Sequence, residues 1–276
     1  MFSEKEVNEK FNQEYSNLEK EIKRPNILIV GGTGVGKSSL VNKVFGKEVS
    51  KVSNLKPETR GIKVYELKDV VLLDTEGFEL GTDKNRIFEE KIIDEIERRK
   101  SGPEKNQIHL IWHLISASSE RITDYDVDLF KKLQSFGLPV AVVFTKSDIA
   151  NEAGMDDMVK RLYPSLTYDE SFNDFDSTPF FVSSTEENEE LSAKYLINWS
   201  IKKLPEALRF AFTSSQILNY EAKFDNAKSI INQHTLGNSA VGFTPIPFSD
   251  APVLIASQIG MITRIVKLYN ITEVNV

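Results

Sequence analysis

Hydrophobic positions near the start of the chain follow a helical period. Apolar residues recur there at steps of three and four, namely Val7, Phe11, Tyr15, Leu18 and Ile22. Pro25 ends the pattern, which predicts an amphipathic helix over residues 1–24. Packing on the domain that follows is the favoured interpretation. The charges on the polar faces are mixed, so a partner-binding or membrane-surface helix is the alternative.

Beyond residue 25, short apolar runs alternate with amphipathic stretches. The runs predict strands over residues 26–30, 61–67, 70–74, 107–116, 139–145 and 179–184. The amphipathic stretches predict helices from Lys37, over 84–99, over 124–136, over 156–162 and from Glu187. This order is typical of an α/β fold with a mostly parallel sheet and helices on both faces, here over residues 25–204.

The strand pattern stops after Leu204. Residues 205–235 have a helical pattern and residues 236–269 are weakly charged, so residues 205–276 are predicted to form a helical C-terminal extension. A helical hairpin that packs on the α/β domain or on another copy is the favoured interpretation. Membrane association and a membrane hairpin are the alternatives.

Two features weigh against a membrane-spanning segment in this extension. The apolar stretch 251–263 is shorter than the ~20 residues that a spanning helix needs. Pro245 and Pro247 would interrupt a longer helix.

Composition narrows the class of protein. The hydrophobic content of 40% and charged content of 27% in 276 residues are ordinary for a globular protein. A net charge of −7 disfavours direct nucleic-acid binding, and the absence of cysteine excludes disulfides and thiolate metal sites. The charged N-terminus lacks the apolar core of a secretory signal, so we expect a cytoplasmic protein, with peripheral membrane attachment as the alternative.

The stretch "GGTGVGKS" lies directly between a predicted strand and a predicted helix. Gly31, Gly36, Lys37 and Ser38 satisfy the P-loop pattern, in which backbone N–H groups and the helix N-terminus surround phosphates. We expect Lys37 to reach the β- and γ-phosphates and Ser38 to bind Mg²⁺. The predicted nucleotide-binding residues here are Gly32, Thr33, Gly34, Val35, Gly36, Lys37, Ser38 and Ser39. The fold expected is the three-layer P-loop NTPase sandwich.

Downstream residues extend the site. In "DTEG", Asp74 is placed to support Mg²⁺, and the amide of Gly77 is placed to bond the γ-phosphate. Thr59 is the only threonine between Ser38 and Asp74, and is the candidate that closes over the metal. The metal set is therefore Ser38, Thr59 and Asp74, and the catalytic set is Lys37, Thr59 and Gly77.

A second polar group follows the strand "VAVVFT". Asp148 can accept from N1–H and from the exocyclic amine of guanine, a donor pair that adenine lacks, and the Lys146 stem can cover the base. Thr145 begins this motif. The arrangement favours GTP over ATP.

In this order, the motifs and "VSS" at 182–184 resemble those of the translation-factor-related small GTPases of the Era, TrmE and septin type, over about residues 26–203. The resemblance implies that Ser183 and Ser184 lie near the guanine carbonyl. It also implies that Thr145, where the family more often has Asn, loosens a supporting contact. "TPIPFSDAP" and the apolar segment after it resemble a helical region attached to some bacterial Era-like GTPases.

The resemblance implies a Mg²⁺-dependent switch that hydrolyses GTP to GDP and phosphate. Ras-like members place a water-orienting Gln directly after the glycine that corresponds to Gly77. This chain has Phe78 there, so slow intrinsic turnover is expected. A partner protein, or a homodimer formed through the G domains or the C-terminal helices, is one source of the missing help with GTP hydrolysis. A different side chain is the other source of help, and Glu76, Glu79, Arg60 and Arg86 are the nearby candidates, each interpreted as a solvated charge rather than a catalytic group. The alternative function is a nucleotide-binding, oligomerising scaffold with little hydrolysis, attached or not to a membrane.

His109 and His113 have a spacing that suggests metal ligands. No cysteine or acidic third ligand flanks them, so they are interpreted as core or sheet-face histidines.

Overall fold

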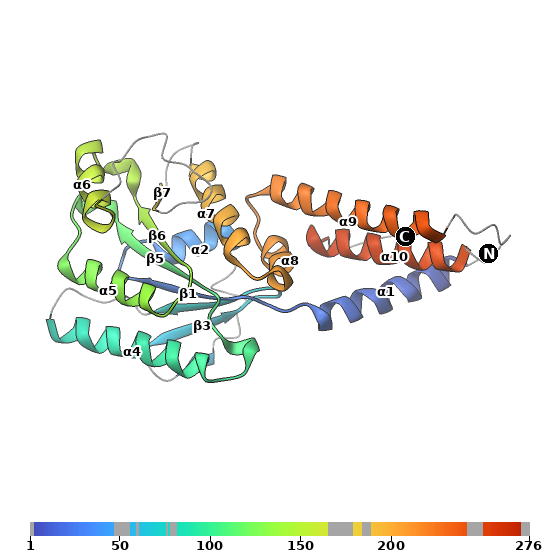
Figure 1. The fold of residues 1–276 in the computed structure, drawn as a ribbon, viewed down its shortest axis with the longest axis horizontal. Coiled ribbons are helices and arrows are strands. Elements are labelled where there is room, and N and C mark those ends of the chain that lie inside the picture. Colours follow the sequence, from blue (N-terminus) through green and yellow to red (C-terminus); the bar gives the residue numbers. More distant parts are fainter. Residues whose placement is uncertain are drawn as a thin grey trace.

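The computed structural model describes residues 3–46, 56–58, 61–75, 77, 82–164, 179–183, 189–241 and 251–271. Within them, a seven-stranded sheet has the order β2-β3-β4-β1-β5-β6-β7 (Figure 1). The strands are β1 (Asn26–Gly31), β2 (Lys56–Glu58), β3 (Ile62–Glu66), β4 (Val71–Thr75), β5 (Leu110–Ser116), β6 (Val140–Thr145) and β7 (Phe180–Val182). The five strands from β4 to β7 in this order are parallel, and β3 and β2 add antiparallel at one edge. The mostly parallel sheet is confirmed, while β2 lacks an apolar run and was not predicted.

The helices are α1 (Glu4–Glu21), α2 (Lys37–Phe45), α4 (Thr82–Lys100), α5 (Asp124–Ser135), α6 (Glu152–Leu162), α7 (Glu189–Lys203), α8 (Glu206–Ser215), α9 (Tyr220–Val241) and α10 (Ala251–Leu268). Short 3-10 turns are η1 (Glu104–Asn106), η2 (Ala117–Ser119) and η3 (Ser147–Ile149).

One predicted helix start was wrong for a local reason. Helix α6 begins at Glu152, ahead of the predicted start, because the Asn151 side chain accepts from the Gly154 amide at 2.8 Å and caps the helix. The helical pattern predicted over 205–235 is confirmed and corresponds to two helices, α8 and α9. The chain turns between them, where the Asn219 amide donates to the Gln216 side chain at 2.7 Å.

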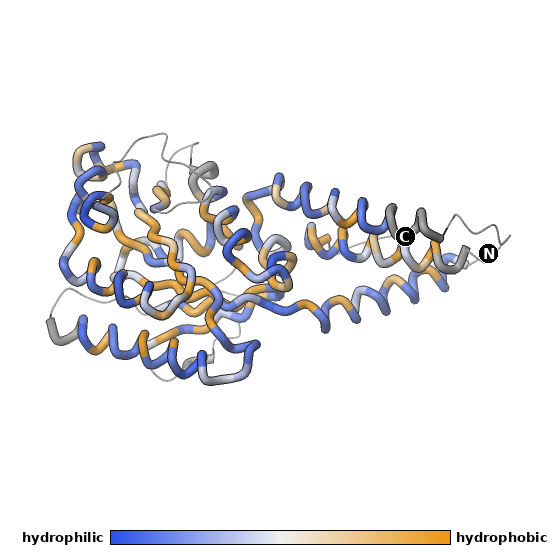
Figure 2. Tube along the Cα trace, viewed as in Figure 1, coloured by the Kyte–Doolittle hydropathy of each residue, from blue (hydrophilic) through white to orange (hydrophobic). Residues whose placement is uncertain are grey.

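Two hydrophobic cores lie on opposite faces of the sheet, because neighbouring strand residues point to opposite faces. Leu28 and Val30 of β1 contact the core formed with α4, α5 and α6. Ile27 and Ile29 contact the core formed with α2, α7 and α8. Every residue of β1 is buried, as expected for a parallel strand covered on both sides, and Figure 2 shows hydrophobic residues concentrated along the strands. The three-layer architecture is thus confirmed.

Helices α1, α9 and α10, here called the helical extension, project together from one end of the α/β domain (Figure 1). Phe11 of α1 packs against Ile259 and Val266 of α10. On the other side of α10, Leu268 packs with Ala227 and Ile230 of α9. The expectation that the N-terminal helix packs on the domain that it precedes was therefore wrong for most of its length. Its apolar stripe is covered by the last helix of the chain.

Helices α9 and α10 pack on each other as a hairpin, and α1 adds a third helix on the other side of α10. None of the helices within the described residues combines the length and the apolar character that crossing a bilayer requires. Pro245 and Pro247 lie outside the described residues.

His113 is a core residue, and His109 is a half-buried residue directly before β5, which agrees with their interpretation as core or sheet-face histidines. His109 accepts a hydrogen bond from the Asn26 amide through Nδ1 at 3.0 Å. His113 is fully buried against Phe130, with ring centroids 6.5 Å apart, and neither of its ring nitrogens has a hydrogen-bond partner in the described part of the chain. The described part of the chain also contains no group of three or more His, Cys, Asp or Glu side chains placed to hold a metal.

The buried His113 predicts loss of stability in acid. Burial lowers its pKa from 6.5 to about 4, so below pH 6.5 the unfolded chain binds a proton that the folded chain refuses. The free energy of unfolding should fall by about 3 kcal/mol on this account as the pH drops through that range. In His113→Leu this contribution should vanish, as measured by urea unfolding at several pH values. Equal pH dependence in both proteins would contradict the prediction.

Candidate nucleotide-binding site

The P-loop connects the end of β1 to the start of α2. A Cβ on Gly31 would lie 2.6 Å from the Leu114 carbonyl oxygen, so the close approach of β5 requires glycine there. Gly34 and Gly36 have φ of 73° and 102°, in the left-handed region that glycine tolerates. No side chain caps the start of α2 and its first turn holds no acidic residue, so its N–H groups remain suited to an anion.

Lys37 is buried at the base of this loop, with 8% exposure. Its Nζ donates to the carbonyl oxygens of Gly31 at 2.8 Å and Gly32 at 3.0 Å, which bends the side chain back along the loop. Burial lowers the pKa of Lys37, and the nearby Asp74 carboxylate partly opposes the shift. Ser38 and Ser39 follow in the first turn of α2 and are exposed.

Asp74 lies near the end of β4, directly beside Ile29 of β1. Burial raises its pKa, while the charges of Lys37 and Lys63 oppose the rise. Its Oδ1 is buried and has no hydrogen-bond partner among the described residues. A buried carboxylate oxygen that lacks a hydrogen-bond partner among the described residues suits the hard, oxygen-ligated Mg²⁺ ion.

Gly77 contacts the P-loop backbone. A Cβ at this position would lie 2.4 Å from both N and Cα of Thr33, a distance that no side chain can occupy. The glycine of "DTEG" is therefore held against the phosphate-binding loop, as its predicted role requires.

The guanine motif follows β6. The Thr145 hydroxyl donates to the Val35 carbonyl of the P-loop at 2.5 Å, and its side chain lies beside Gly36. The threonine hydroxyl therefore contacts the P-loop directly. A looser contact than the Asn of the family would give stays a prediction. Lys146 adopts a left-handed conformation with φ 56°, and Asp148 follows in η3. The two motifs are thus joined through one hydrogen bond.

Several predicted residues lie outside the described part of the chain, namely Thr59, Arg60, Glu76, Phe78, Glu79 and Ser184. Ser183 lies near α2, where its carbonyl accepts from Lys43 Nζ at 3.4 Å. Arg86 forms an exposed ion pair with Glu90 at 3.6 Å, one helical turn along α4. The roles of these residues in binding or catalysis stay predictions.

Glu120 is a residue that sequence reasoning missed. It has φ 51°, and its carboxylate accepts from the Asn151 amide at 2.9 Å and from Asn151 Nδ2 at 2.6 Å. Gly154 leaves room for it, since a Cβ there would lie 2.7 Å from the Glu120 side chain. Glu120 thereby fixes the chain just after Asp148. No local sequence pattern marks it, because its partner is more than one secondary-structure element away.

We expect Glu120→Ala to weaken GTP binding by about tenfold, through lost order of the loop that carries Asp148. Titration with a fluorescent GTP derivative measures the change. Glu152→Ala, an exposed acidic residue beside the same loop, is the matched control and should bind as the unaltered chain does. Equal affinity for Glu120→Ala would show that the bonds to Asn151 do not support the site.

The sequence comparisons find relatives that are described as GTPases or GTP-binding proteins. The family model described as a 50S ribosome-binding GTPase matches residues 26–146. The chain is 30% identical over 139 residues to a probable GTP-binding protein EngB of Aquifex aeolicus, covering 50% of this chain and 74% of that protein. It is 26% identical over 142 residues to the GTPase Era of Caldicellulosiruptor saccharolyticus, covering 50% of this chain and 44% of that protein. A crystal structure of a probable EngB aligns with a TM-score of 0.47 and 20% identity, over 64% of this chain and 99% of that one.

Proposed function

This chain belongs to the 50S ribosome-binding GTPase family, and we propose that Lys37, Gly77 and Asp148 carry its binding and hydrolysis of GTP. Its nucleotides are GTP and GDP, and hydrolysis makes the protein a switch. The observation that supports the residue assignment most strongly is the meeting of three loops. Val35 accepts from Thr145, and Thr33 lies against Gly77, at the carboxyl ends of β1, β4 and β6. Ligands of open α/β sheets bind at this edge.

The proposed roles follow from the chemistry of each group. The P-loop amides and the Lys37 ammonium stabilise the negative charge that develops on the β–γ bridge and on the transferred phosphoryl group. The Gly77 amide senses the γ-phosphate, and the Asp148 carboxylate selects guanine. Ser38, Thr59 and Asp74 would hold Mg²⁺, which neutralises phosphate charge when bound.

Slow intrinsic turnover is part of the proposal, because Phe78 has no group that orients water. Single-turnover phosphate release at increasing protein concentration tests it. A slow rate that rises with concentration supports activation by self-association. Fast release that is independent of concentration would contradict the proposed slow turnover.

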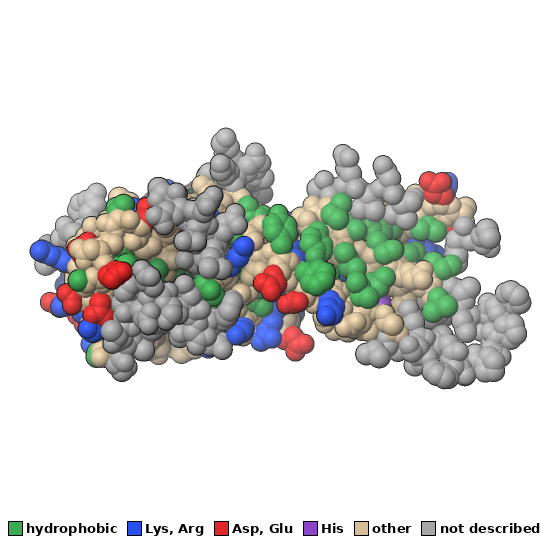
Figure 3. Space-filling model, turned by 90° about the horizontal axis from the view of Figure 1, so that it is seen from above, with side chains coloured by type: hydrophobic (Ala, Val, Ile, Leu, Met, Phe, Trp, Pro, Cys, Tyr) green, Lys and Arg blue, Asp and Glu red, His purple; other side chains and the backbone are tan. Residues whose placement is uncertain are grey.

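We propose self-association through the C-terminal helices as the partner interaction. Tyr220 and Phe224 of α9 are 66% and 62% exposed, and Ile231 on the same helix is 43% exposed. Figure 3 shows hydrophobic side chains gathered over the extension. Grouped exposed apolar residues of this kind mark interaction sites. A cytoplasmic location fits this proposal. The alternative is that the same exposed apolar residues attach the protein to the surface of a membrane.

Replacing Tyr220 and Phe224 by serine should therefore lower the association constant of the dimer by about tenfold. Sedimentation velocity of the full chain with GTP and Mg²⁺ gives the measurement, with Glu221→Gln as an exposed control on the same helix. Flotation with liposomes of neutral and anionic lipid is the second arm. A monomer that floats with lipid would replace the dimer proposal by membrane attachment.

A further inference from the structure

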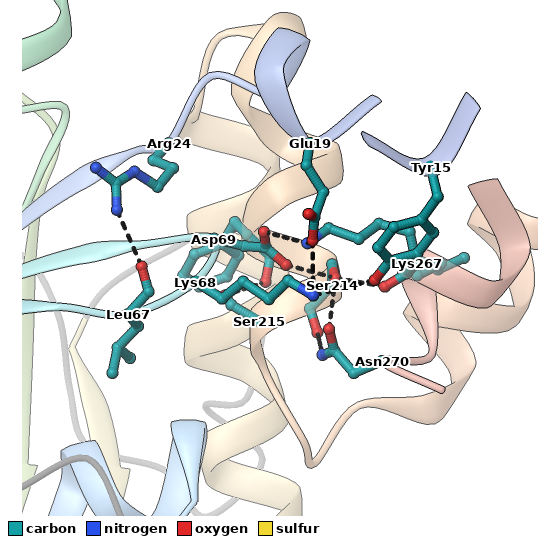
Figure 4. Close-up of polar contacts among 12 residues, drawn as sticks. Tyr15, Glu19, Arg24, Leu67, Lys68, Asp69, Ser214, Ser215, Lys267 and Asn270 are labelled. Carbon is teal, nitrogen blue, oxygen red and sulfur yellow. Dashed lines mark hydrogen bonds and ion pairs between the residues drawn. The ribbon is translucent and has the colours of Figure 1, made fainter. Parts of the chain in front are cut away.

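The turn between β3 and β4 lies against the base of the helical extension and is partly buried, although turns usually lie at the surface. The turn is closed by a bond from the Leu67 amide to the Val70 carbonyl at 2.9 Å. Within it, Asp69 is only 3% exposed. The close-up in Figure 4 shows side chains from α1, α8 and α10 converging on this turn.

Asp69 holds two helices through its carboxylate. Lys267 Nζ of α10 lies 2.7 Å from Asp69 Oδ1, and both side chains are almost fully buried. The Ser214 hydroxyl of α8 donates to Asp69 Oδ2 at 3.0 Å (Figure 4). A buried ion pair has high desolvation costs, so it is either well formed or must separate far enough to admit water. The contact therefore favours two discrete arrangements over gradual change.

The same turn also contacts α1. Lys68 Nζ lies 2.7 Å from Glu19 Oε1 and donates to the Tyr15 hydroxyl at 3.0 Å. Lys267 Nζ is 3.5 Å from the same Glu19 oxygen, which joins α1 and α10 at one point. Lys223 of α9 completes the base by donating to the carbonyl oxygens of two residues that flank this cluster, Ser214 and Leu268, at 3.0 Å each. All three helices of the extension thus meet the β3–β4 turn or its immediate contacts.

The other end of the same hairpin lies at the nucleotide site. β3 and β4 are paired along their whole length, from Ile62 with Thr75 to Glu66 with Val71. Their five residues span ~17 Å at the usual rise of a strand. At the far end are Asp74 and, two residues beyond β4, Gly77 against the P-loop. GTP and GDP differ at this end, through the γ-phosphate.

We propose that the helical extension responds to the bound nucleotide through this hairpin, with the Asp69–Lys267 pair as the connection. The inference rests on the proposed function, because it needs the γ-phosphate to act at Gly77 and Asp74. A ligand can shift a conformation only if it interacts differently with the two states, and the hairpin end meets that condition. Coupling between sites is reciprocal. A change at the junction must then alter the preference between GTP and GDP.

Asp69→Asn tests the connection in the full chain with Mg²⁺. The substitution keeps the shape and removes the charge that Lys267 requires. We expect the ratio of affinities for GDP and a GTP analogue that resists hydrolysis to change by about fivefold or more. Amide hydrogen exchange over α10 should differ between the two nucleotides in the unaltered chain, and less so in the variant. Lys5→Met is the control, because it removes an exposed ion pair with Glu9 at the far end of α1.

Each outcome decides one point. An affinity ratio within about twofold of the unaltered chain, in a variant that folds, overturns the inference. Equal exchange of α10 with both nucleotides in the unaltered chain also overturns it, and needs no variant. If Asp69→Asn does not fold, the double variant Asp69→Asn with Lys267→Met removes both members of the buried pair and should show the same change in ratio. Failure of the unaltered chain to bind guanine nucleotides would instead contradict the proposed function.

Discussion

Lys37→Met is expected to lower the single-turnover rate of GTP hydrolysis by about 10³-fold, the effect of removing a preorganised charge from a developing anion. The buried ammonium is held by the carbonyl oxygens of Gly31 and Gly32, at 2.8 and 3.0 Å. Methionine has a similar length without charge or donor groups, so the loop keeps its volume and loses its cation. GTP affinity should fall as well, because the ammonium also meets the ground-state phosphates.

Phosphate release with protein in excess over GTP measures the rate, and titration with a fluorescent nucleotide measures the affinity. Lys131→Met, an exposed substitution on α5, is the matched control and should leave both values unchanged. A Lys37→Met protein that hydrolyses GTP at nearly the original rate would exclude the P-loop as the site of the reaction.

Asp148→Asn is expected to weaken GTP binding by about 10²- to 10³-fold and to improve binding of xanthosine triphosphate. In the proposed site the Asp148 carboxylate accepts two hydrogen bonds from guanine, and each charge-assisted bond contributes about 1.5–3 kcal/mol. An asparagine amide places a donor where guanine also has a donor. Xanthine carries an oxygen at that position, so the amide can bond to it.

Competition of labelled GTP with unlabelled GTP, ATP and xanthosine triphosphate gives all the affinities in one experiment. Asp157→Asn, exposed on α6, is the control substitution. Unchanged GTP affinity in Asp148→Asn would overturn the assignment of the guanine contact. Strong competition by ATP in the unaltered chain would do the same for the preference between bases.

The motifs themselves could be located in the chain because each is local. Gly31 to Ser38, Asp74 with Gly77, and Thr145 to Asp148 each follow an apolar run, and the carboxyl ends of parallel strands meet at one edge of a sheet. The structure places Thr145 against Val35 and Gly77 against Thr33 at that edge. Helix starts were harder to predict, since the cap at Asn151 lies outside the apolar pattern.

Long-range partners could not be predicted in this way. The stripe of α1 indicates an apolar surface, but a stripe does not identify what covers it, and here the cover is α10 from the other end of the chain. Glu120 and Asp69 look like ordinary surface acids in the sequence. Their partners are Asn151 and Lys267, which only the folded chain brings to them.

The sequence by itself therefore determined the α/β class, the order of its motifs and the preference for a guanine nucleotide, because periodicity and motif spacing depend on neighbouring residues. The tertiary structure decided which helix covers α1, which polar groups are buried and how the β3–β4 turn meets the extension. These depend on packing between segments that are far apart along the chain. The free energy of that packing is a property of the assembled surfaces rather than of any one segment.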